Sequence, residues 1–235
     1  MPTKPKIVVF SGAGISAESG LKTFRDHDGL WNNYSIEDVC SVEAWQKQPQ
    51  VVLEFYNMRR REAAKAQPNA AHLAIAKLES AYDVTVITQN VDDLHEKAGS
   101  MRVVHVHGEL AKARSCADEN LVYPIGSKDI VWGELCDKGS QLRPHIVWFG
   151  ENVMHLDTAL DCFMAADKVL VVGTSLSVFP VAGLVRYAEQ ASEKILVSLD
   201  VDNVPWDYDF KRAKATEAVP GVVEHWLNKA STGDA

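Results

Sequence analysis

Short, continuous runs of apolar and β-branched residues recur along the chain, with stretches of helical apolar spacing between several of them. Continuous runs of this length are typical of strands that are buried on both faces of a sheet. The predicted strands are Lys6–Phe10, Val84–Thr88, Val103–Val106, His145–Phe149, Lys168–Gly173 and Lys194–Leu199. The predicted helices are Asn69–Ser80, Leu156–Ala165, Val181–Gln190 and Val222–Asn228.

Strands that alternate with helices predict the α/β class, here a doubly wound Rossmann-type parallel sheet with a small inserted module. Two stretches interrupt the alternation: residues 30–67 are mostly helical, and residues 114–143 are polar and irregular. Both are longer than ordinary connections between a strand and a helix. We assign them to the small module, and residues 1–29, 68–113 and 144–235 to the Rossmann-type domain. A cleft between the two parts is the expected ligand site.

The composition restricts the class of partner. The chain has 235 residues, of which 46% are hydrophobic and 24% charged, and its net charge of −8 makes a dedicated nucleic-acid binder unexpected. No apolar run approaches the roughly 20 residues of a membrane span, and the N-terminus lacks the pattern of a signal peptide. Four scattered cysteines fit a reducing environment. We therefore expect a cytoplasmic protein that binds neither nucleic acid nor membranes.

A glycine-containing segment follows the first predicted strand. Gly12, Gly14 and Ala17 match G-x-G-x-x-G/A, in which backbone N–H groups and a helix N-terminus approach a pyrophosphate. A tight turn that binds no ligand would give the same pattern. A dehydrogenase also places an acidic residue at the end of a second strand about 20 residues later. That residue is missing here, which weakens an oxidoreductase assignment and leaves a phosphate-binding loop.

Polar residues follow or end two further predicted strands. Gln89, Asn90 and Asp92 offer donors and acceptors that suit ribose hydroxyls or an amide, although Asn90 or Asp92 could instead cap the next helix. His105 and His107 are two residues apart on a predicted strand and therefore share one face. One of them is a candidate base, because imidazole titrates near neutral pH. The alternatives are a structural histidine or part of a metal site.

A second loop of small residues, Gly173–Ser175, follows another buried strand. It could hold a phosphate or a ribose, or it could simply begin a helix. Asp200 comes at the end of the last predicted strand. A carboxylate there accepts hydrogen bonds from ribose hydroxyls and repels a 2′-phosphate, which favours NAD over NADP if a dinucleotide binds.

Taken together, five segments resemble the sirtuins, the NAD-dependent protein lysine deacylases. They are residues 12–26 (GAGISAESGLKTFRD), 88–95 (TQNVDDLH), 105–110 (HVHGEL), 143–151 (RPHIVWFGE) and 173–180 (GTSLSVFP). The segments occur in the family's order and are distributed over most of the chain, so the resemblance is specific. It implies a Rossmann-type domain with a small module, NAD as the cofactor, and acyl-lysine proteins or peptides as substrates.

The resemblance also implies roles for individual residues. His107 would be the base that deprotonates a ribose hydroxyl of NAD, and Asn90 would share in catalysis. The residues that would bind NAD are Gly12, Ala13, Gly14, Phe24, Arg25, Trp31, Gln89, Asn90, Asp92, Gly173, Thr174, Ser175, Asp200 and Ala215. The residues that would bind the acylated peptide are Tyr56, Arg59, Val147, Trp148, Phe149 and Gly150. The last four would pair with the extended peptide as an added strand.

One predicted helix bears on the acyl group. In residues 50–65, Tyr56 and Arg59 fall on an apolar stripe and are expected to face inward, whereas Arg60 and Arg61 are expected to face solvent. A buried guanidinium requires an anion, either a substrate carboxylate or an internal Asp or Glu. The Tyr-x-x-Arg pattern resembles the signature of class III sirtuins, which implies activity on succinyl- and malonyl-lysine.

The chain departs from the class III pattern at three positions. His27 stands where members usually have a small alanine, Lys22 replaces a proline, and Asp200 replaces an asparagine. A bulky His27 could narrow the acyl pocket or, if it is protonated, help to hold a carboxylate.

The largest departure concerns zinc, which most sirtuins hold with two C-x-x-C pairs. Ser115 occupies a ligand position, Cys116 is one residue late, and Cys136 lacks a partner because Gly139 occupies the other place. Two thiols at unrelated spacing do not make a closed tetrahedral site, so we predict no structural zinc. Packing must then hold residues 114–143, and the candidate residues are Leu121, Val122, Tyr123, Ile125, Val131, Trp132 and Leu135.

The sequence therefore predicts an NAD-dependent protein lysine deacylase that removes acetyl groups and also succinyl or malonyl groups. Nicotinamide and O-acyl-ADP-ribose are the expected products. Two alternatives stay open: a protein ADP-ribosyltransferase that uses the same cleft, and a non-catalytic module that senses NAD. The presence of His107 and of the substrate-strand segment argues against the non-catalytic module.

Overall fold

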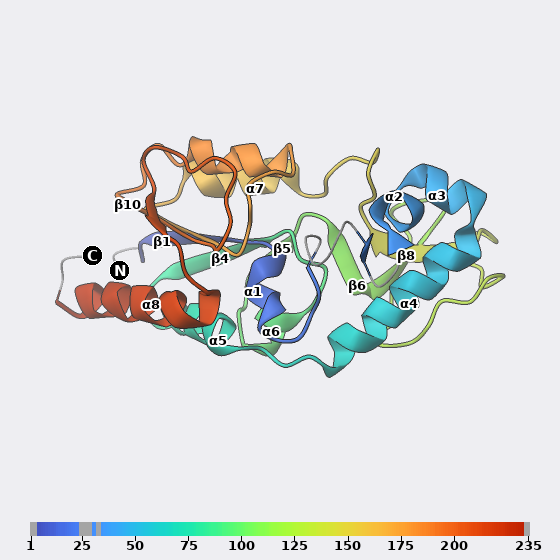
Figure 1. The fold of residues 1–235 in the computed structure, drawn as a ribbon, viewed down its shortest axis with the longest axis horizontal. Coiled ribbons are helices and arrows are strands. Elements are labelled where there is room, and N and C mark those ends of the chain that lie inside the picture. Colours follow the sequence, from blue (N-terminus) through green and yellow to red (C-terminus); the bar gives the residue numbers. More distant parts are fainter. Residues whose placement is uncertain (1–3, 24–29, 32–33, 233–235) are drawn as a thin grey trace.

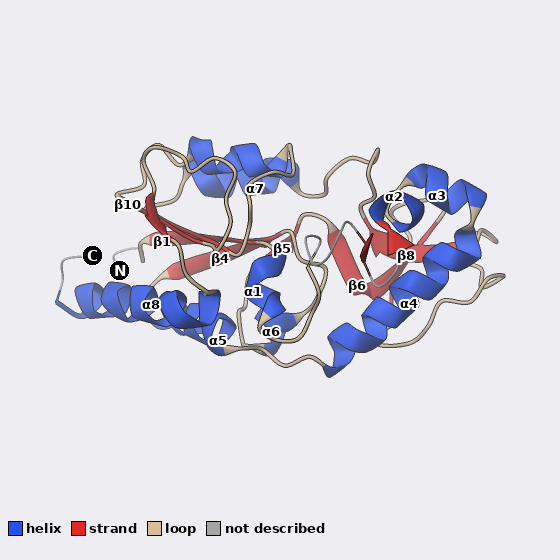
Figure 2. Ribbon diagram, viewed as in Figure 1, coloured by secondary structure: helices blue, strands red, loops and turns tan. Residues whose placement is uncertain are grey.

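The fold is described from a computed structural model of residues 4–23, 30–31 and 34–232. Figure 1 shows two lobes: a large lobe built on a parallel sheet, and a small lobe that contains α2, α3, α4, β6 and β8. In the large lobe, helices lie on both faces of the sheet (Figure 2). The predicted α/β class and doubly wound sheet are therefore confirmed.

The large sheet has six strands in the order β11-β10-β9-β1-β4-β5, and every neighbouring pair is parallel. Its strands are β1 (Lys6–Ser11), β4 (Asp83–Thr88), β5 (Val103–His105), β9 (Lys168–Val172), β10 (Glu193–Val197) and β11 (Asp209–Lys211). Five of them match predicted strands. The short edge strand β11 was missed, because Asp-Phe-Lys has no apolar run.

The strand predicted over His145–Phe149 was placed in the wrong sheet. It is β8 (Leu142–Ile146), and it pairs antiparallel with β6 (Gly108–Ser115) in a three-stranded sheet of order β7-β6-β8. Strand β7 is Val122–Pro124. An apolar run indicates burial but does not specify the sheet to which a strand belongs.

The two faces of β1 explain why its sequence is continuously apolar. Ile7 and Val9 pack in a core with α5 (Ala70–Lys77) and α8 (Ala215–Thr232), the two helices below the sheet in Figure 1. Val8 and Phe10 pack in a second core on the opposite face. That core is covered by α7 (Leu156–Met164) and the 3-10 helix η2 (Val181–Tyr187).

The small lobe surrounds a third core. Its helices are α2 (Ile36–Val39), α3 (Val42–Lys47) and α4 (Pro49–Lys65), and a two-stranded sheet joins β2 (Leu30–Trp31) to β3 (Tyr34–Ser35). Helix α4 begins at a proline, whose missing N–H would have no partner in the first turn of a helix. Its buried face places Phe55 and Tyr56 against Leu110, Ile146 and Trp148.

Packing in residues 114–143 differs in part from the prediction. Leu121, Tyr123 and Ile125 are partly buried around a core of Leu53, Ala113, Ile130, Cys136 and Leu142. The predicted packing residues Val131, Trp132 and Leu135 are instead exposed. The segment buries Ile130, their neighbour, because the side chain of Asn57 on α4 hydrogen-bonds both backbone groups of that residue.

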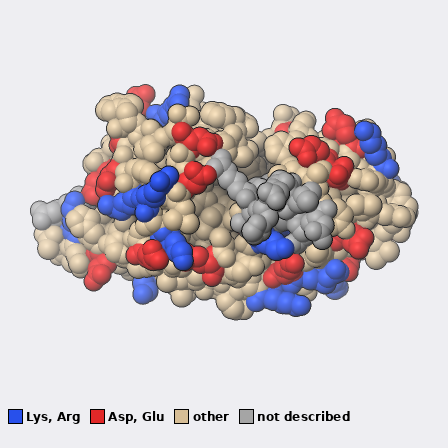
Figure 3. Space-filling view, in the orientation of Figure 1, with Lys and Arg blue, Asp and Glu red and all other residues tan. Residues whose placement is uncertain are grey.

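Acidic and basic side chains are interspersed on the face of the molecule shown in Figure 3. Among the described residues, no helix combines the length and the apolar character that a membrane crossing requires. The domain boundaries stay a prediction. The small antiparallel sheet takes β6 and β8 from both sides of residues 114–143.

Candidate active site

Two loops meet at the carboxyl ends of adjacent strands in the large sheet. The chain leaves β1 at Gly12, which precedes the short helix α1 (Ala13–Ala17), and it leaves β9 at Gly173. The N–H of Gly14 donates to the carbonyl oxygen of Gly173 over 2.8 Å. A Cβ on Gly12 or Gly14 would lie 2.8 Å from that same oxygen. These glycines are therefore required for contact between the loops, a reason additional to any approach of a phosphate.

A cavity of about 570 Å³ lies over this junction. It is at the carboxyl ends of the central strands, where the sheet order reverses and α/β proteins bind their ligands. The predicted site residues that line it are Gly12, Ala13, Gly14, Gln89, Asn90, His107, Gly173, Thr174, Ser175, Asp200 and Ala215. Several other residues line the cavity, including Glu18 and Thr23, which lie in the segment 12–26 but were not assigned a role, and Lys214, which lies outside every quoted motif.

The side chains of Gln89 and Asn90 are held in place by the two loops. The amide of Asn90 donates to the carbonyl oxygen of Gly12 and to the hydroxyl of Ser16, over 3.2 Å in each case. The amide of Gln89 donates to Thr174 Oγ1 over 3.0 Å. Polar groups fixed by such hydrogen bonds can act on a ligand without first being ordered.

His107 is the histidine of this cavity. Its Nδ1 lies 3.2 Å from the carbonyl oxygen of Gln89, which can only accept, so Nδ1 carries the proton and Nε2 has a free lone pair. Burial lowers the pKa of His107, more than the Gln89 carbonyl raises it. The ring is therefore neutral at pH 7 and can accept a proton at Nε2.

The expectation that His105 and His107 share one face is wrong. Strand β5 ends at His105, and the chain turns before His107, so the alternation of a strand does not extend to it. His105 lines a different cavity, which has no lining residue in common with that of His107.

Asp92 was interpreted from the sequence either as a ligand-binding residue or as a helix cap, and it lies close to both a helix start and a cavity. Its Oδ1 accepts the N–H of Leu94, the first residue of α6 (Leu94–Lys97), over 3.1 Å, although the N-cap residue of this helix is Asp93. Asp92 also lines a small cavity of about 30 Å³ that shares Ala13, Gln89 and Asn90 with the large one. Burial raises the pKa of Asp92 above its ordinary value.

Arg59 lines the same small cavity, together with Lys22 and Asp92. It is half-buried, as the helical stripe predicted, and burial lowers its pKa although nearby Tyr56, Cys40 and Asp92 favour the charge. Tyr56 lies deeper, where its hydroxyl donates to Cys40 Sγ over 3.4 Å and accepts from Trp148 Nε1 over 3.1 Å.

The expectation that Arg60 faces solvent is wrong, whereas Arg61 is exposed as predicted. Arg60 is 1% exposed, and its Nε donates to the carbonyl oxygen of Leu110 over 2.6 Å. Its Nη1 donates to Asn57 Oδ1. Helix α4 is covered on this second side by β6 and the segment at Ile130, which a helical pattern alone does not reveal.

The segment predicted to pair with a peptide joins the lobes. The N–H of Val147 donates to the carbonyl oxygen of His107, and the N–H of Phe149 donates to that of Cys40, each over 2.9 Å. Trp148 is buried, whereas the Phe149 side chain is 55% exposed. Gly150 has a φ of 92° and is exposed.

Three candidate residues, Phe24, Arg25 and His27, lie outside the described residues, and so does the side chain of Trp31. The positions that correspond to a zinc site lack a suitable donor set. Cys136 Sγ donates to the hydroxyl of Ser115 over 3.2 Å, and the described residues contain no group of three or more His, Cys, Asp or Glu suited to a metal ion. Two thiols and a hydroxyl do not fit the four N/S ligands of structural zinc.

The sequence and the fold were compared with known proteins. The family model described as the Sir2 family matches residues 12–180. The NAD-dependent protein deacylase of Helicobacter pylori strain 26695 is 54% identical over 184 residues, which cover 78% of this chain and 80% of the relative. The NAD-dependent protein deacylase of Vibrio cholerae is 46% identical over 230 residues, with 94% and 93% covered.

Solved structures agree with these relatives. An ADP-ribose complex of a variant Sir2 homologue superposes with a TM-score of 0.88 at 39% identity, covering 97% of this chain and 94% of that one. An NAD complex of a Sir2 homologue gives 0.85 at 39% identity, covering 97% and 91%. On these findings, this chain belongs to the Sir2 family.

Proposed function

We propose that this protein is an NAD-dependent protein deacylase whose substrates are acylated lysine side chains of proteins. The observation that carries the proposal is the position of His107, a neutral base in one cavity with the two glycine loops and the amides of Gln89 and Asn90. Membership of the Sir2 family and the names of the relatives support the same activity. The partners are proteins or peptides rather than nucleic acid or membranes, and the location is the cytoplasm.

The residues of the large cavity fit a dinucleotide. Asp200 and Ala215 would hold the adenosine end, and the backbone N–H groups beside Gly12 and Gly173 would face the phosphates. Gln89 and Asn90 would bind the second ribose and the nicotinamide amide, with Asp92 in the adjoining small cavity. Bound there, NAD supplies an ADP-ribosyl group whose bond to nicotinamide is broken when the acyl oxygen attacks.

His107 would move one proton in this reaction. Its free Nε2 accepts the proton of a ribose hydroxyl, while Nδ1–H keeps its hydrogen bond to the carbonyl oxygen of Gln89. That carbonyl oxygen orients the ring and stabilises the imidazolium as it forms. Because the pKa of His107 is lowered, the base stays neutral at physiological pH and is lost only in acid.

Arg59 is the residue that would recognise a carboxylate on the acyl chain. It lines the small cavity beside Asn90 and Asp92, and a guanidinium there can grip a carboxylate in a bidentate pair. The acyl groups we propose are succinyl and malonyl in addition to acetyl. Tyr56 would support this site from the core of the small lobe.

The test is a panel of acetyl-, succinyl-, malonyl- and long-chain acyl-lysine peptides incubated with NAD labelled in the adenosine part. Deacylation predicts nicotinamide release that depends on the acyl peptide, with the label in O-acyl-ADP-ribose. Label retained on protein would establish ADP-ribosyl transfer instead. Binding of NAD without release of nicotinamide would establish a sensing module.

A further inference from the structure

We propose that His105 is a positioning residue that carries a full positive charge in the folded protein and holds the backbone of Asn90 through it. The proposal deepens the proposed function, because Asn90 belongs to the proposed catalytic site. His105 itself lines a second cavity and not the large cavity that contains His107.

The hydrogen bonds of the ring require two protons. Nδ1 of His105 lies 2.9 Å from the carbonyl oxygen of Asn90, and Nε2 lies 2.7 Å from Glu96 Oε1. A backbone carbonyl and an ionised carboxylate can only accept, and a neutral imidazole has a single N–H. Either neutral tautomer would therefore place a nitrogen lone pair against an oxygen lone pair. The imidazolium alone satisfies both contacts.

A protonated Glu96 would be the other way to satisfy the ring, and the surroundings disfavour it. The Glu96 side chain is 41% exposed, so water can stabilise its charge. Burial raises the pKa of Glu96, but the hydrogen bond and charge of His105 lower it further, to a value below the ordinary one. The carboxylate is therefore ionised at neutral pH.

The charges around His105 favour the imidazolium. Three carboxylates lie near the His105 ring: Glu96 on α6, Glu109 on β6, and Asp92 in the loop after β4. The cations are Lys112, which is paired with Glu109, Lys97, which is paired with Asp93, and Arg60 on α4. A buried neutral His95 also lies near. Burial lowers the pKa of His105, but Glu96 and the Asn90 carbonyl outweigh it and hold the pKa above its ordinary value.

The charged ring adds to the hydrogen bonds that hold the backbone and the side chain of Asn90. The N–H of Asn90 donates to Thr88 Oγ1 over 3.0 Å, its carbonyl oxygen accepts from His105, and its side-chain amide is held by the loop after β1. When the ring loses its charge, the remaining proton stays on Nε2, because the Glu96 carboxylate is a stronger acceptor than the Asn90 carbonyl oxygen. Nδ1 is then without a proton, and the buried carbonyl oxygen of Asn90 loses a charge-assisted partner. The peptide can then rotate, and the amide that faces the large cavity moves with it.

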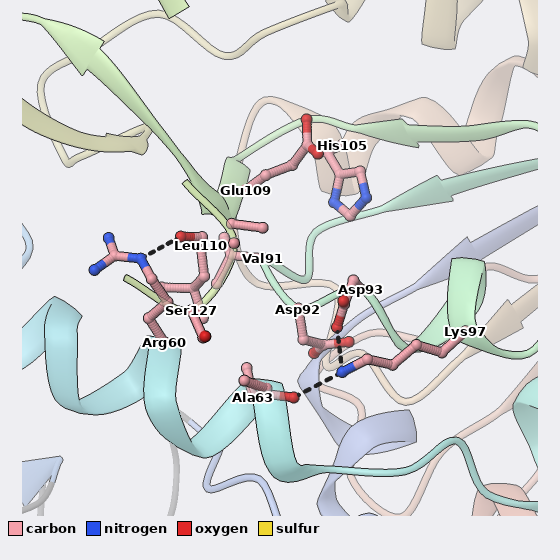
Figure 4. A pocket seen from close by; sticks show the side chains of 13 residues that line it. Arg60, Ala63, Val91, Asp92, Asp93, Lys97, His105, Glu109, Leu110 and Ser127 are labelled. Atoms are coloured by element: carbon pink, nitrogen blue, oxygen red, sulfur yellow. Dashed lines mark hydrogen bonds and ion pairs between the residues drawn. The ribbon is translucent and has the colours of Figure 1, made fainter. Parts of the chain in front are cut away.

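The ring can exchange its proton without using the catalytic cavity. Figure 4 shows His105 at the edge of a cavity of about 240 Å³, with Glu109 above it and Asp92, Asp93 and Lys97 across the opening. This cavity shares no lining residue with the large cavity, although it shares Val91 and Asp92 with the small one. A dinucleotide in the large cavity would therefore not prevent titration of His105.

The raised pKa of His105 determines the sign of the pH dependence. A histidine whose pKa is raised on folding makes its charged contacts at lower pH and loses them as pH rises through the folded pKa. His105 therefore gives an alkaline limb in kcat for nicotinamide release. His107, with its lowered pKa, gives the separate acid limb.

The test combines NMR with kinetics. Nitrogen chemical shifts of the His105 ring at pH 7 should show both nitrogens protonated, and a neutral ring would overturn the proposal. The Glu96→Gln variant should shift the alkaline limb of kcat to lower pH by about one unit, since it removes a charged hydrogen-bond partner worth roughly one pKa unit or more. Glu109→Gln removes a nearby carboxylate that pairs with Lys112 and that acts on His105 through its charge alone, so it should shift the limb much less. Equal shifts in the two variants would overturn the proposal.

A second pair of variants separates positioning from folding. Asn at position 105 can place an N–H donor where Nδ1 lies, so His105→Asn should keep kcat within about threefold and lose the alkaline limb, whereas His105→Leu should lower kcat about tenfold with NAD affinity little changed. An alkaline limb that persists in His105→Asn would contradict the proposal. If the wild-type protein releases no nicotinamide from any acyl peptide, the proposed function fails, while the NMR result still decides the charge of His105.

Discussion

His107 and Asn90 show how much the backbone decides about a functional side chain. Each is fixed by carbonyl oxygens of neighbouring loops, Gln89 for His107 and Gly12 for the Asn90 amide. Residue types alone identified both residues but left His105 and His107 equivalent, and only the resemblance to the sirtuins singled out His107. Their difference depends on where β5 ends, which a pattern of residue types does not specify.

The proposed role of Arg59 in acyl recognition predicts the effect of its substitution. Arg59→Met should lower kcat/KM for succinyl-lysine peptide by about tenfold to a hundredfold, because the bidentate pair with the carboxylate is lost. Activity on acetyl-lysine, which carries no charge, should change by less than about threefold.

The matched control for this prediction is Arg61→Met, which removes an exposed arginine from the same helix. It should leave the ratio of the two activities unchanged. An equal loss on succinyl and acetyl substrates in Arg59→Met would remove Arg59 from acyl recognition.

At the scale of elements, the central strands follow directly from apolar patterning, whereas the last helix was predicted only over Val222–Asn228 and extends from Ala215 to Thr232. The strands around β1 bury both faces, and α4 runs from Pro49 to Lys65, one residue earlier than predicted. The predictions were wrong where contacts between distant parts of the chain determine burial or strand pairing. The second covered side of α4 buries Arg60, β8 joins the small sheet, and β11 has too few apolar residues to be recognised.

The contact between the two glycine loops predicts the effect of a substitution. Gly173 has a φ of 64°, and a Cβ there would lie 2.2 Å from the backbone nitrogen of Ile15. Gly173→Ala should lower the free energy of unfolding by about 2–4 kcal/mol, since it adds left-handed strain to a backbone clash. It should also weaken NAD binding, because both loops line the large cavity.

Gly221→Ala is the control for the glycine prediction. Gly221 lies within α8, and a Cβ there meets nothing within 4 Å. Alanine should raise the free energy of unfolding by roughly 0.5–1 kcal/mol. Urea unfolding of both variants measures the difference, and similar stabilities would contradict the contact between the loops.

For the whole molecule, we expect the small lobe to stay folded on its own packing, without a structural zinc ion. Its irregular segment is anchored by Ile130, Leu142 and Cys136 against Leu53 and Ala113. The hydroxyl of Ser115 accepts a hydrogen bond from the Cys136 thiol.

A metal-removal experiment tests that account. Purified protein dialysed against excess chelator should keep its Tm within about 2 °C and keep its deacylase activity, because no metal ligation contributes to folding. Elemental analysis should find much less than one equivalent of zinc. A fall in Tm that added zinc reverses would show that residues near Cys116 and Cys136 bind metal after all.

The central claim is that the large cavity at the carboxyl ends of β1 and β9 brings a neutral His107 to the ribose of NAD. The most direct measurement compares wild type with His107→Ala in single-turnover assays with acyl-lysine peptide and NAD, with calorimetry for NAD binding. We expect wild type to form nicotinamide, free lysine peptide and O-acyl-ADP-ribose in equal amounts. The variant should bind NAD but form the deacylated peptide and O-acyl-ADP-ribose at least about a hundredfold more slowly. Formation of these products by His107→Ala at a rate close to that of wild type would contradict the claim.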